Sequence, residues 1–199
     1  MQDFRSCTFC FMGRSGSGKD TQGDLLHKFL EKEGLKIVHV STGDQARALR
    51  EKGTAVGQYI KKILDAGKLF PDWLADSLWI CVLQQDMMPN DAVILDGTPR
   101  RINEAKFLDE FMTALERPLP IPIYLDITDE EATRRLLARG RPDDTPEVIA
   151  QRLSWFPTKV LPIVDFYGQR VVKIDGSGDS EKDVLPRLLK SLKGLRLKV

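Results

Sequence analysis

The sequence contains little of what several protein classes require. It has three cysteines and two histidines among 199 residues, and Cys7 and Cys10 lie in an apolar run with no second pair to complete a zinc site. We therefore expect buried thiols and no structural zinc. No stretch approaches the ~18 apolar residues of a membrane span, and the N-terminal segment lacks a small-residue cleavage signal. The expectation is a cytoplasmic protein with no membrane partner.

The charge also lacks a dominant sign. Thirty Lys and Arg residues against 29 Asp and Glu residues give a net charge of +1, which argues against a general nucleic-acid binder. Any phosphate ligand must therefore be held by a local group of cations. Because 42% of the residues are hydrophobic, a chain of this length can bury a sizeable core, and we expect one compact domain.

Short apolar runs alternate with longer amphipathic segments. This alternation is typical of a parallel sheet covered by helices. Strands are predicted near residues 7–12, 36–40, 92–96, 121–126 and 171–175. Helices are predicted near residues 20–33, 44–52, 55–66, 72–87, 103–116, 129–139, 145–167 and 181–192. Pro157 and Pro162 should kink or divide the helix around them.

The strongest motif is GRSGSGKDT, residues 13–21, which follows an apolar strand and opens a helix. Gly13, Gly16 and Gly18 permit a tight loop whose backbone N–H groups point at phosphate oxygens. Lys19 would reach the β- and γ-phosphates of a bound nucleotide. The alternative, a purely structural glycine turn, does not explain the lysine. The motif therefore predicts a phosphate-binding loop.

Two acidic residues, Asp20 and Asp96, are relevant to where a magnesium ion could bind. Asp20 separates Lys19 from Thr21, although a hydroxyl residue normally follows the lysine of such a loop and meets magnesium. Direct contact of Thr21 with a metal is therefore not expected. Asp96 ends the apolar strand AVILD, and its carboxylate should emerge beside the loop, where it could hold Mg²⁺ through water. The alternative for Asp96 is an ordinary strand-end aspartate.

Five blocks, in their order and rough spacing, resemble adenylate kinases and their monophosphate kinase relatives: GRSGSGKDTQ, STGDQAR, GKLFPDWL, DGTPRRINEA and RLLARGRPDD with a later QRL. The resemblance covers essentially the whole chain. It implies a P-loop NTPase-type three-layer α/β fold with a five-stranded parallel sheet. It also implies a helical insert at 41–70 that binds the acceptor monophosphate and a short lid at 139–152, the rest being the core.

The same resemblance implies reversible transfer of a phosphoryl group from magnesium ATP to AMP, giving two ADP, by a monomer with no nucleic-acid partner. The residues it assigns to catalysis are Lys19, Arg100, Arg139, Arg141 and Arg152. Those assigned to ATP are Gly13, Ser15, Gly16, Ser17, Gly18, Lys19, Asp20, Thr21, Arg135, Arg139 and Gly178. Those assigned to AMP are Thr42, Gly43, Arg47, Leu69, Gly97, Arg100, Glu104, Arg141 and Arg152.

The arginine set has a chemical reason beside the resemblance. Transfer between two polyanions needs separate cationic clamps for the donor, the acceptor and the migrating group. A planar guanidinium suits this task because it donates two parallel hydrogen bonds to a phosphate. Singly, an arginine on a helix is more often solvated, and Arg134 is assigned to that class. Asp143 and Asp144 either orient arginines or serve as ordinary acidic residues at a helix start.

The sequence departs from the family at several positions. Only Gly140 separates Arg139 from Arg141, which predicts a minimal lid. Glu104 replaces a glutamine of the family, Thr98 a phenylalanine and Arg101 a threonine. An ionised Glu104 offers only acceptors and would suit the N1 and N2 donors of guanine. A kinase for GMP or a pyrimidine monophosphate therefore stays open beside AMP, as does a non-catalytic nucleotide-binding regulatory protein.

Overall fold

The structure, a computed structural model, describes residues 3–195, and its centre is a five-stranded parallel sheet. The strand order is β2-β3-β1-β4-β5, and every neighbouring pair is parallel. The predicted α/β class with a five-stranded parallel sheet is confirmed. The strands are β1 Thr8–Gly13, β2 Ile37–Ser41, β3 Ala92–Asp96, β4 Ile121–Asp126 and β5 Val172–Asp175.

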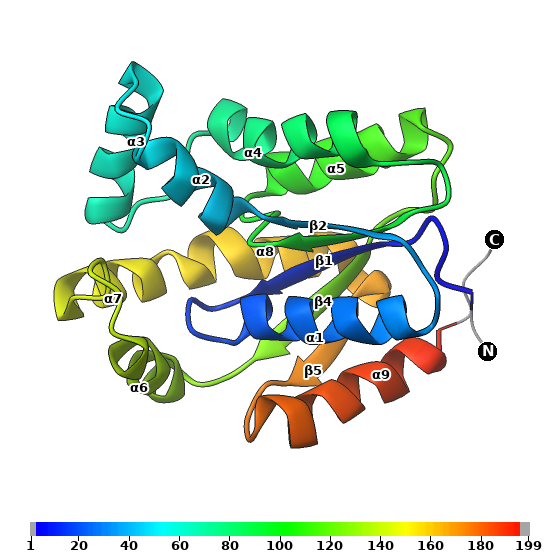
Figure 1. Cartoon of the computed structure of the whole chain (residues 1–199). Coiled ribbons are helices and arrows are strands. Elements are labelled where there is room, and N and C mark those ends of the chain that lie inside the picture. The colour runs from blue at the N-terminus through cyan, green and yellow to red at the C-terminus, as the bar shows by residue number, and fades with distance from the viewer. Residues whose placement is uncertain (1–2, 196–199) are drawn as a thin grey trace.

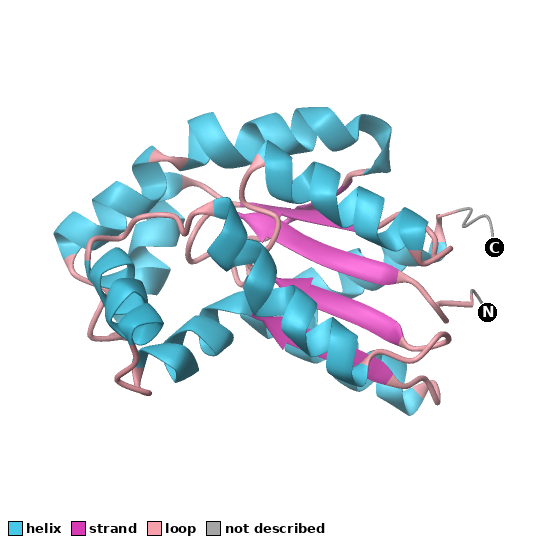
Figure 2. Ribbon diagram, turned by 90° about the horizontal axis from the view of Figure 1, so that it is seen from above, coloured by secondary structure: helices cyan, strands magenta, loops and turns pink. Residues whose placement is uncertain are grey.

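Helices cover both faces of this sheet, which gives three layers (Figures 1 and 2). On one face lie α1 and α9, and on the other lie α4, α5 and α8. The α-helices are α1 Lys19–Lys32, α2 Thr42–Arg50, α3 Ala55–Asp65, α4 Asp72–Asp86, α5 Ile102–Ala114, α6 Asp129–Arg139, α7 Pro146–Ser154, α8 Leu161–Tyr167 and α9 Leu185–Lys193. Within residues 3–195, none of the helices combines the length and apolar character needed to cross a membrane.

The central strand β1 supplies both halves of the core because successive side chains of a strand point to opposite faces. Phe9 and Phe11 pack with residues of α1 and α9, whereas Cys10 packs with Trp79 and Leu108 of α4 and α5. All of β1 is buried, as expected for a strand between two helical layers. Cys7 and Cys10 are buried thiols, as predicted, whereas Cys81 is exposed on α4.

The strand order places a binding site at the carboxyl end of β1. The chain connects β1 to β2 through α1, whereas β1 pairs with β3 and β4, so the order reverses at β1. Ligands of open parallel sheets bind at such switch points. The pairs α2–α3 and α6–α7 also project at this end, while both ends of the described chain lie at the opposite end (Figure 1).

The predicted helix at 145–167 is divided, as its prolines indicated. A π-helical turn at Phe156–Val160 separates α7 from α8, and Pro157 and Pro162 cannot donate the backbone hydrogen bonds of a continuous helix. A second π-helical turn, Ser180–Val184, precedes α9, and a 3-10 turn, Gly168–Arg170, follows α8. The start of α6 is fixed by Thr128, whose side chain accepts a hydrogen bond from the backbone N–H of Glu131.

Candidate active site

The phosphate-binding loop lies between β1 and α1, where the motif placed it. Gly16 and Gly18 have φ values of 84° and 90°, which side-chain-bearing residues rarely adopt. A Cβ atom at Gly16 would also lie 2.7 Å from the carbonyl oxygen of Ala132. The Lys19 ammonium turns back over the loop and donates to the carbonyl oxygens of Gly13, at 3.2 Å, and Arg14, at 2.7 Å. Burial is the largest effect on Lys19 and lowers its pKa to about 8.

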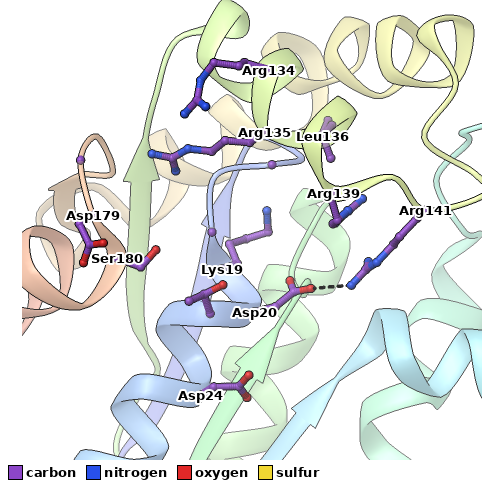
Figure 3. A pocket seen from close by; sticks show the side chains of 14 residues that line it. Lys19, Asp20, Asp24, Arg134, Arg135, Leu136, Arg139, Arg141, Asp179 and Ser180 are labelled. Carbon is purple, nitrogen blue, oxygen red and sulfur yellow. Dashed lines mark ion pairs between the residues drawn. The ribbon is translucent and has the colours of Figure 1, made fainter.

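A cavity on one side of the loop is lined by eight of the residues predicted to bind ATP, and we call it the donor cavity after that prediction (Figure 3). Arg135, on α6, forms part of its wall, and its Nη2 donates to the carbonyl oxygen of Gly176 at 2.9 Å. Gly178, in the loop after β5, also lines the cavity. Arg134, which was assigned to solvent, lies at the rim; its side chain is 69% exposed and pairs with Glu131. Thr21 and Asp20 line the same cavity from α1.

The arginines at 139–152 are held by two adjacent aspartates. Arg139 donates two hydrogen bonds of 2.8 Å to the carboxylate of Asp144, and Arg152 donates a third at 2.9 Å. Arg152 also pairs with Asp143. The Asp144 side chain is fully buried, so three charge-assisted hydrogen bonds fix two guanidinium groups relative to each other. The structure therefore gives these aspartates the orienting contacts that the sequence left open.

Arg141 forms an ion pair with the first turn of α1. Its Nη2 lies 3.5 Å from Oδ2 of Asp20, an ion pair drawn in Figure 3. The pair joins the segment after α6 to the first turn of α1, 121 positions apart in the chain. Asp20 therefore supplies a counter-charge to this arginine, a contact that the sequence did not predict.

A second cavity also borders the loop, and it is lined by most of the other cationic side chains of the site. It shares Lys19, Arg139 and Arg141 with the donor cavity. Its further cationic lining residues are Arg47, Lys68, Arg100 and Arg152. Ser15 and Gly43 line it too. We call this space the central cavity; it brings together all five residues predicted to be catalytic.

Arg100 differs from its neighbours in the central cavity. Arg47 pairs with Asp44, and the arginines at 139, 141 and 152 pair with aspartates. Within the described part of the chain, Arg100 bonds only through its backbone N–H, to Glu104, and its guanidinium has no partner. Burial is the main influence on Arg100 and lowers its pKa. A partly buried guanidinium that has no ion-pair partner is well suited to bind a phosphate.

Beyond Arg100, the central cavity leads to a smaller one that we call the base cavity. Its lining is mostly apolar, and it shares Phe70 and Arg100 with the central cavity. The side chains at its polar end are Thr42, Thr98 and Glu104. Thr42 Oγ1 donates to the carbonyl oxygen of Asp96 at 3.1 Å. The base cavity is lined by Thr42, Leu69, Phe70, Ala75, Leu78, Gly97, Thr98, Arg100 and Glu104, including five of the residues predicted to bind AMP away from the lid.

Two acidic residues near the loop, Asp96 and Asp20, interact with each other and with Lys19. Asp96, at the end of β3, is 3% exposed, and its Oδ1 is buried without a hydrogen-bond partner among the described residues. Burial and the negative charge of Asp20 raise the pKa of Asp96 well above its usual value. Burial opposes ionisation of Asp20, but its interaction with the Asp96 carboxyl and the charges of Lys19 and Arg141 lower its pKa to about 2.

These carboxylates fit a hydrated magnesium ion. The unpartnered oxygen of Asp96 can accept a hydrogen bond from metal-bound water. Among residues 3–195, no three His, Cys, Asp or Glu side chains are grouped to hold a metal ion. Mg²⁺ bound here would therefore take most of its ligands from phosphate oxygens and water, as it does beside nucleotides.

Trp155 joins two segments at the site that the sequence did not connect. It follows α7 and lines the central cavity, and its Nε1 donates to the carbonyl oxygen of Gly67 at 3.1 Å. Gly67 follows α3, so this bond links the segment beyond 139–152 to the segment 41–70. A tryptophan at a helix end carries no spacing signal, although its indole N–H does require a partner when partly buried.

Comparison with known proteins decides the family. A family model described as adenylate kinase matches residues 11–172. The adenylate kinase of Leptospira biflexa serovar Patoc is 39% identical over 191 residues, which cover 92% of this chain and 97% of that protein. The chain belongs to the adenylate kinase family. The adenylate kinase of Stenotrophomonas maltophilia is 35% identical over the same shares of the two chains. That of Leuconostoc mesenteroides is 39% identical over 168 residues, covering 83% of this chain and 86% of its own.

The match confirms the resemblance given by the five sequence blocks. The stretch from 11 to 172 contains the phosphate-binding loop, the segment 41–70 and the arginines at 139–152. It indicates a nucleoside monophosphate kinase, and nothing in the comparisons favours a regulatory protein without turnover. Membership of the adenylate kinase family therefore agrees with a central cavity that is lined by cationic side chains and lies between two other cavities.

Proposed function

We propose that the protein is an adenylate kinase that transfers the γ-phosphoryl group of magnesium ATP to AMP and forms two ADP. The observation that supports this most is the central cavity. Lys19, Arg100 and Arg139 line it together, between a donor-side cavity and the smaller base cavity. Such an arrangement suits transfer between two nucleotides rather than hydrolysis of one.

The donor-side assignment places the ATP phosphates over the loop at 13–21. The turn places backbone N–H groups around the phosphates, and the N-terminus of α1 adds favourable partial charge. Arg135 lies where a donor base could contact it, and Arg139 faces the phosphates. The support is the shared lining of the donor cavity by loop residues and by these two arginines.

The acceptor-side assignment places the AMP phosphate between Arg47 and Arg100 and its base against Glu104. Arg100 is partly buried and has no ion-pair partner among the described residues, so it can offer its donors to a phosphate without first breaking an ion pair. Arg47, Gly43 and Leu69 line the approach from the segment 41–70. Thr42 and Gly97 form the wall beside the base cavity.

Chemistry in this site requires alignment and charge neutralisation rather than a covalent nucleophile. The phosphate of AMP would attack the γ-phosphorus directly, with Lys19, Arg139, Arg141 and Arg152 spreading the transition-state charge. The aspartates at 143 and 144 orient two of these arginines before substrate binds. A preorganised set avoids reorientation at the moment of reaction.

Magnesium enters this proposal as the ion bound to ATP. Asp96 would hold its water shell through the unpartnered Oδ1, and Asp20 would add a second negative charge nearby. When bound, the metal neutralises phosphate charge during transfer. We also propose that 41–70 is the acceptor-binding insert, that 139–152 is a short lid, and that the protein is a cytoplasmic monomer. The family resemblance supports these last assignments.

The reverse reaction tests the proposal without any assumption about the forward acceptor. Purified protein given only ADP and Mg²⁺ should produce equal amounts of ATP and AMP, which ³¹P NMR or ion-exchange chromatography can quantify. A kinase restricted to another acceptor base would leave ADP unchanged. Formation of AMP and phosphate without ATP would point to a hydrolase and contradict the proposal.

A further inference from the structure

Asp20 occupies a position of the phosphate-binding loop where a charged side chain is unusual. It directly follows Lys19, where such loops normally carry a neutral hydroxyl residue that meets magnesium. Asp20 lines both the donor cavity and the central cavity, and 47% of its side chain is exposed. A negative charge therefore lies beside the space in which the proposed function puts the phosphates of ATP.

The counter-charge of Asp20 is a cation that the nucleotide also needs. The ion-pair partner of Asp20 among the described residues is Arg141, at 3.5 Å (Figure 3). Arg141 is one of the three cations that line both cavities, with Lys19 and Arg139. A phosphate group that binds to Arg141 therefore draws the counter-charge away from Asp20.

ATP without a metal ion would leave Asp20 beside phosphate oxygens of the same sign. Two negative charges a few ångströms apart repel each other, and the repulsion is stronger in a partly buried site than in open water. A divalent cation reverses this effect, because it becomes the largest local charge and attracts both the carboxylate and the phosphates. The charge of Asp20 should therefore act in opposite directions on the two forms of the nucleotide.

Asp96 gives an independent indication that a hydrated cation belongs at this place. It is 3% exposed, and its Oδ1 has no hydrogen-bond partner among the described residues. A buried oxygen without a partner costs free energy, and water bound to Mg²⁺ is a donor that would satisfy it. Asp20 and Asp96 interact with each other, so both carboxylates can act on the same ion.

Resting on the proposed function, we propose that Asp20 is a specificity-determining residue for the donor, which favours ATP carrying Mg²⁺ and disfavours ATP without the metal. In the free protein Arg141 balances the charge of Asp20. In the donor complex Arg141 binds phosphate, and Asp20 exchanges this arginine for the metal ion.

Equilibrium binding of a donor analogue tests the inference without turnover. Isothermal titration calorimetry with AMP-PNP, in excess EDTA and in excess MgCl₂, gives two dissociation constants. The ratio of the metal-free constant to the magnesium constant is the factor by which the protein raises the affinity of the nucleotide for Mg²⁺, because the two measurements form a thermodynamic cycle. In Asp20→Asn this ratio should fall by about tenfold or more, since metal-free AMP-PNP is no longer repelled.

Two other roles of Asp20 predict a different result. Asp20 could act only by holding Arg141 in place, or only as an acidic residue in the first turn of α1. In either case its replacement would change both dissociation constants by the same factor, which cancels from the ratio. An unchanged ratio in Asp20→Asn therefore overturns the inference.

Asp24→Asn is the matched control. Asp24 lies one turn further along α1 and lines the donor cavity, so its replacement removes the same charge from the same helix (Figure 3). Its ratio should stay at the wild-type value. An equal fall in both variants would make the general charge of the cavity responsible and would overturn the role of Asp20. Asp20→Ser is a second neutral variant, with the hydroxyl usual for such loops, and it should lower the ratio as Asp20→Asn does.

Failure of this inference can be distinguished from failure of the proposed function. A normal conversion of ADP into ATP and AMP, with the same ratio in Asp20→Asn and wild type, would keep the kinase and remove only the role of Asp20. The predicted fall in the ratio without conversion of ADP would remove the kinase assignment and keep the role of Asp20 in a nucleotide site. Absence of AMP-PNP binding in both media would overturn both.

Discussion

Replacing Lys19 with methionine should lower kcat/KM for ATP by at least about 10³-fold, equivalent to about 4 kcal/mol of transition-state stabilisation. Methionine preserves much of the length and apolar stem of lysine while removing its charge. Lys19 is one of the three cations shared by the donor and central cavities and the one that belongs to the loop, so its loss should remove charge stabilisation from the migrating group itself. A coupled assay with saturating AMP would measure the effect.

Lys28→Met provides the matched control for this prediction. Lys28 lies on the same helix, α1, but is exposed. Its replacement should leave kcat/KM close to the wild-type value. If Lys19→Met keeps more than about a tenth of the activity while folding normally, the loop does not stabilise the transferred phosphoryl group, and the site assignment is wrong.

Replacing Arg100 with alanine should lower kcat/KM for the acceptor by about 10²–10³-fold. Arg100 is partly buried, and its guanidinium has no hydrogen-bond or ion-pair partner among the described residues, so its donors are free for the acceptor phosphate. Arg100 lines both the base cavity and the central cavity, and the central cavity also contains Lys19. Arg100 is therefore the cation between the proposed base site and the transferred phosphoryl group. Initial rates over a range of acceptor concentrations at saturating ATP would measure the loss.

The neighbouring residue supplies the control. Arg101 donates to Asp72 at 2.8 Å and lines neither the central nor the base cavity. Arg101→Ala should change stability more than acceptor use, whereas Arg100→Ala should do the reverse. Equal losses of activity in the two variants would show that Arg100 acts through packing and not on the phosphate.

The features visible in the sequence are those with a local signal. The strand before residue 13, the glycines of the loop and the helix after it are adjacent in the chain, so spacing alone predicted the phosphate-binding loop. Helix caps such as Thr128 are equally local, since the hydrogen bond spans three residues. The division of the predicted helix at 145–167 followed from its prolines.

The features missed are contacts between distant segments. The ion pair of Asp20 with Arg141 and the hydrogen bond from Trp155 to Gly67 depend on how α6, α7 and α3 pack around the sheet. No local period encodes such packing. For the same reason, the sequence presented Glu104 simply as a carboxylate. Only the structure shows that Oε2 of Glu104 accepts hydrogen bonds from Thr98 and from the backbone N–H of Arg100, and that Glu104 lines the base cavity.

The acceptor profile tests the central claim most directly. Purified protein with magnesium ATP should be assayed near neutral pH against AMP, GMP, CMP, UMP and dTMP separately, with a no-acceptor control. We expect the highest kcat/KM with AMP. A preference for GMP or a pyrimidine monophosphate, or no transfer to any of the five, would contradict the assignment of this protein as an adenylate kinase.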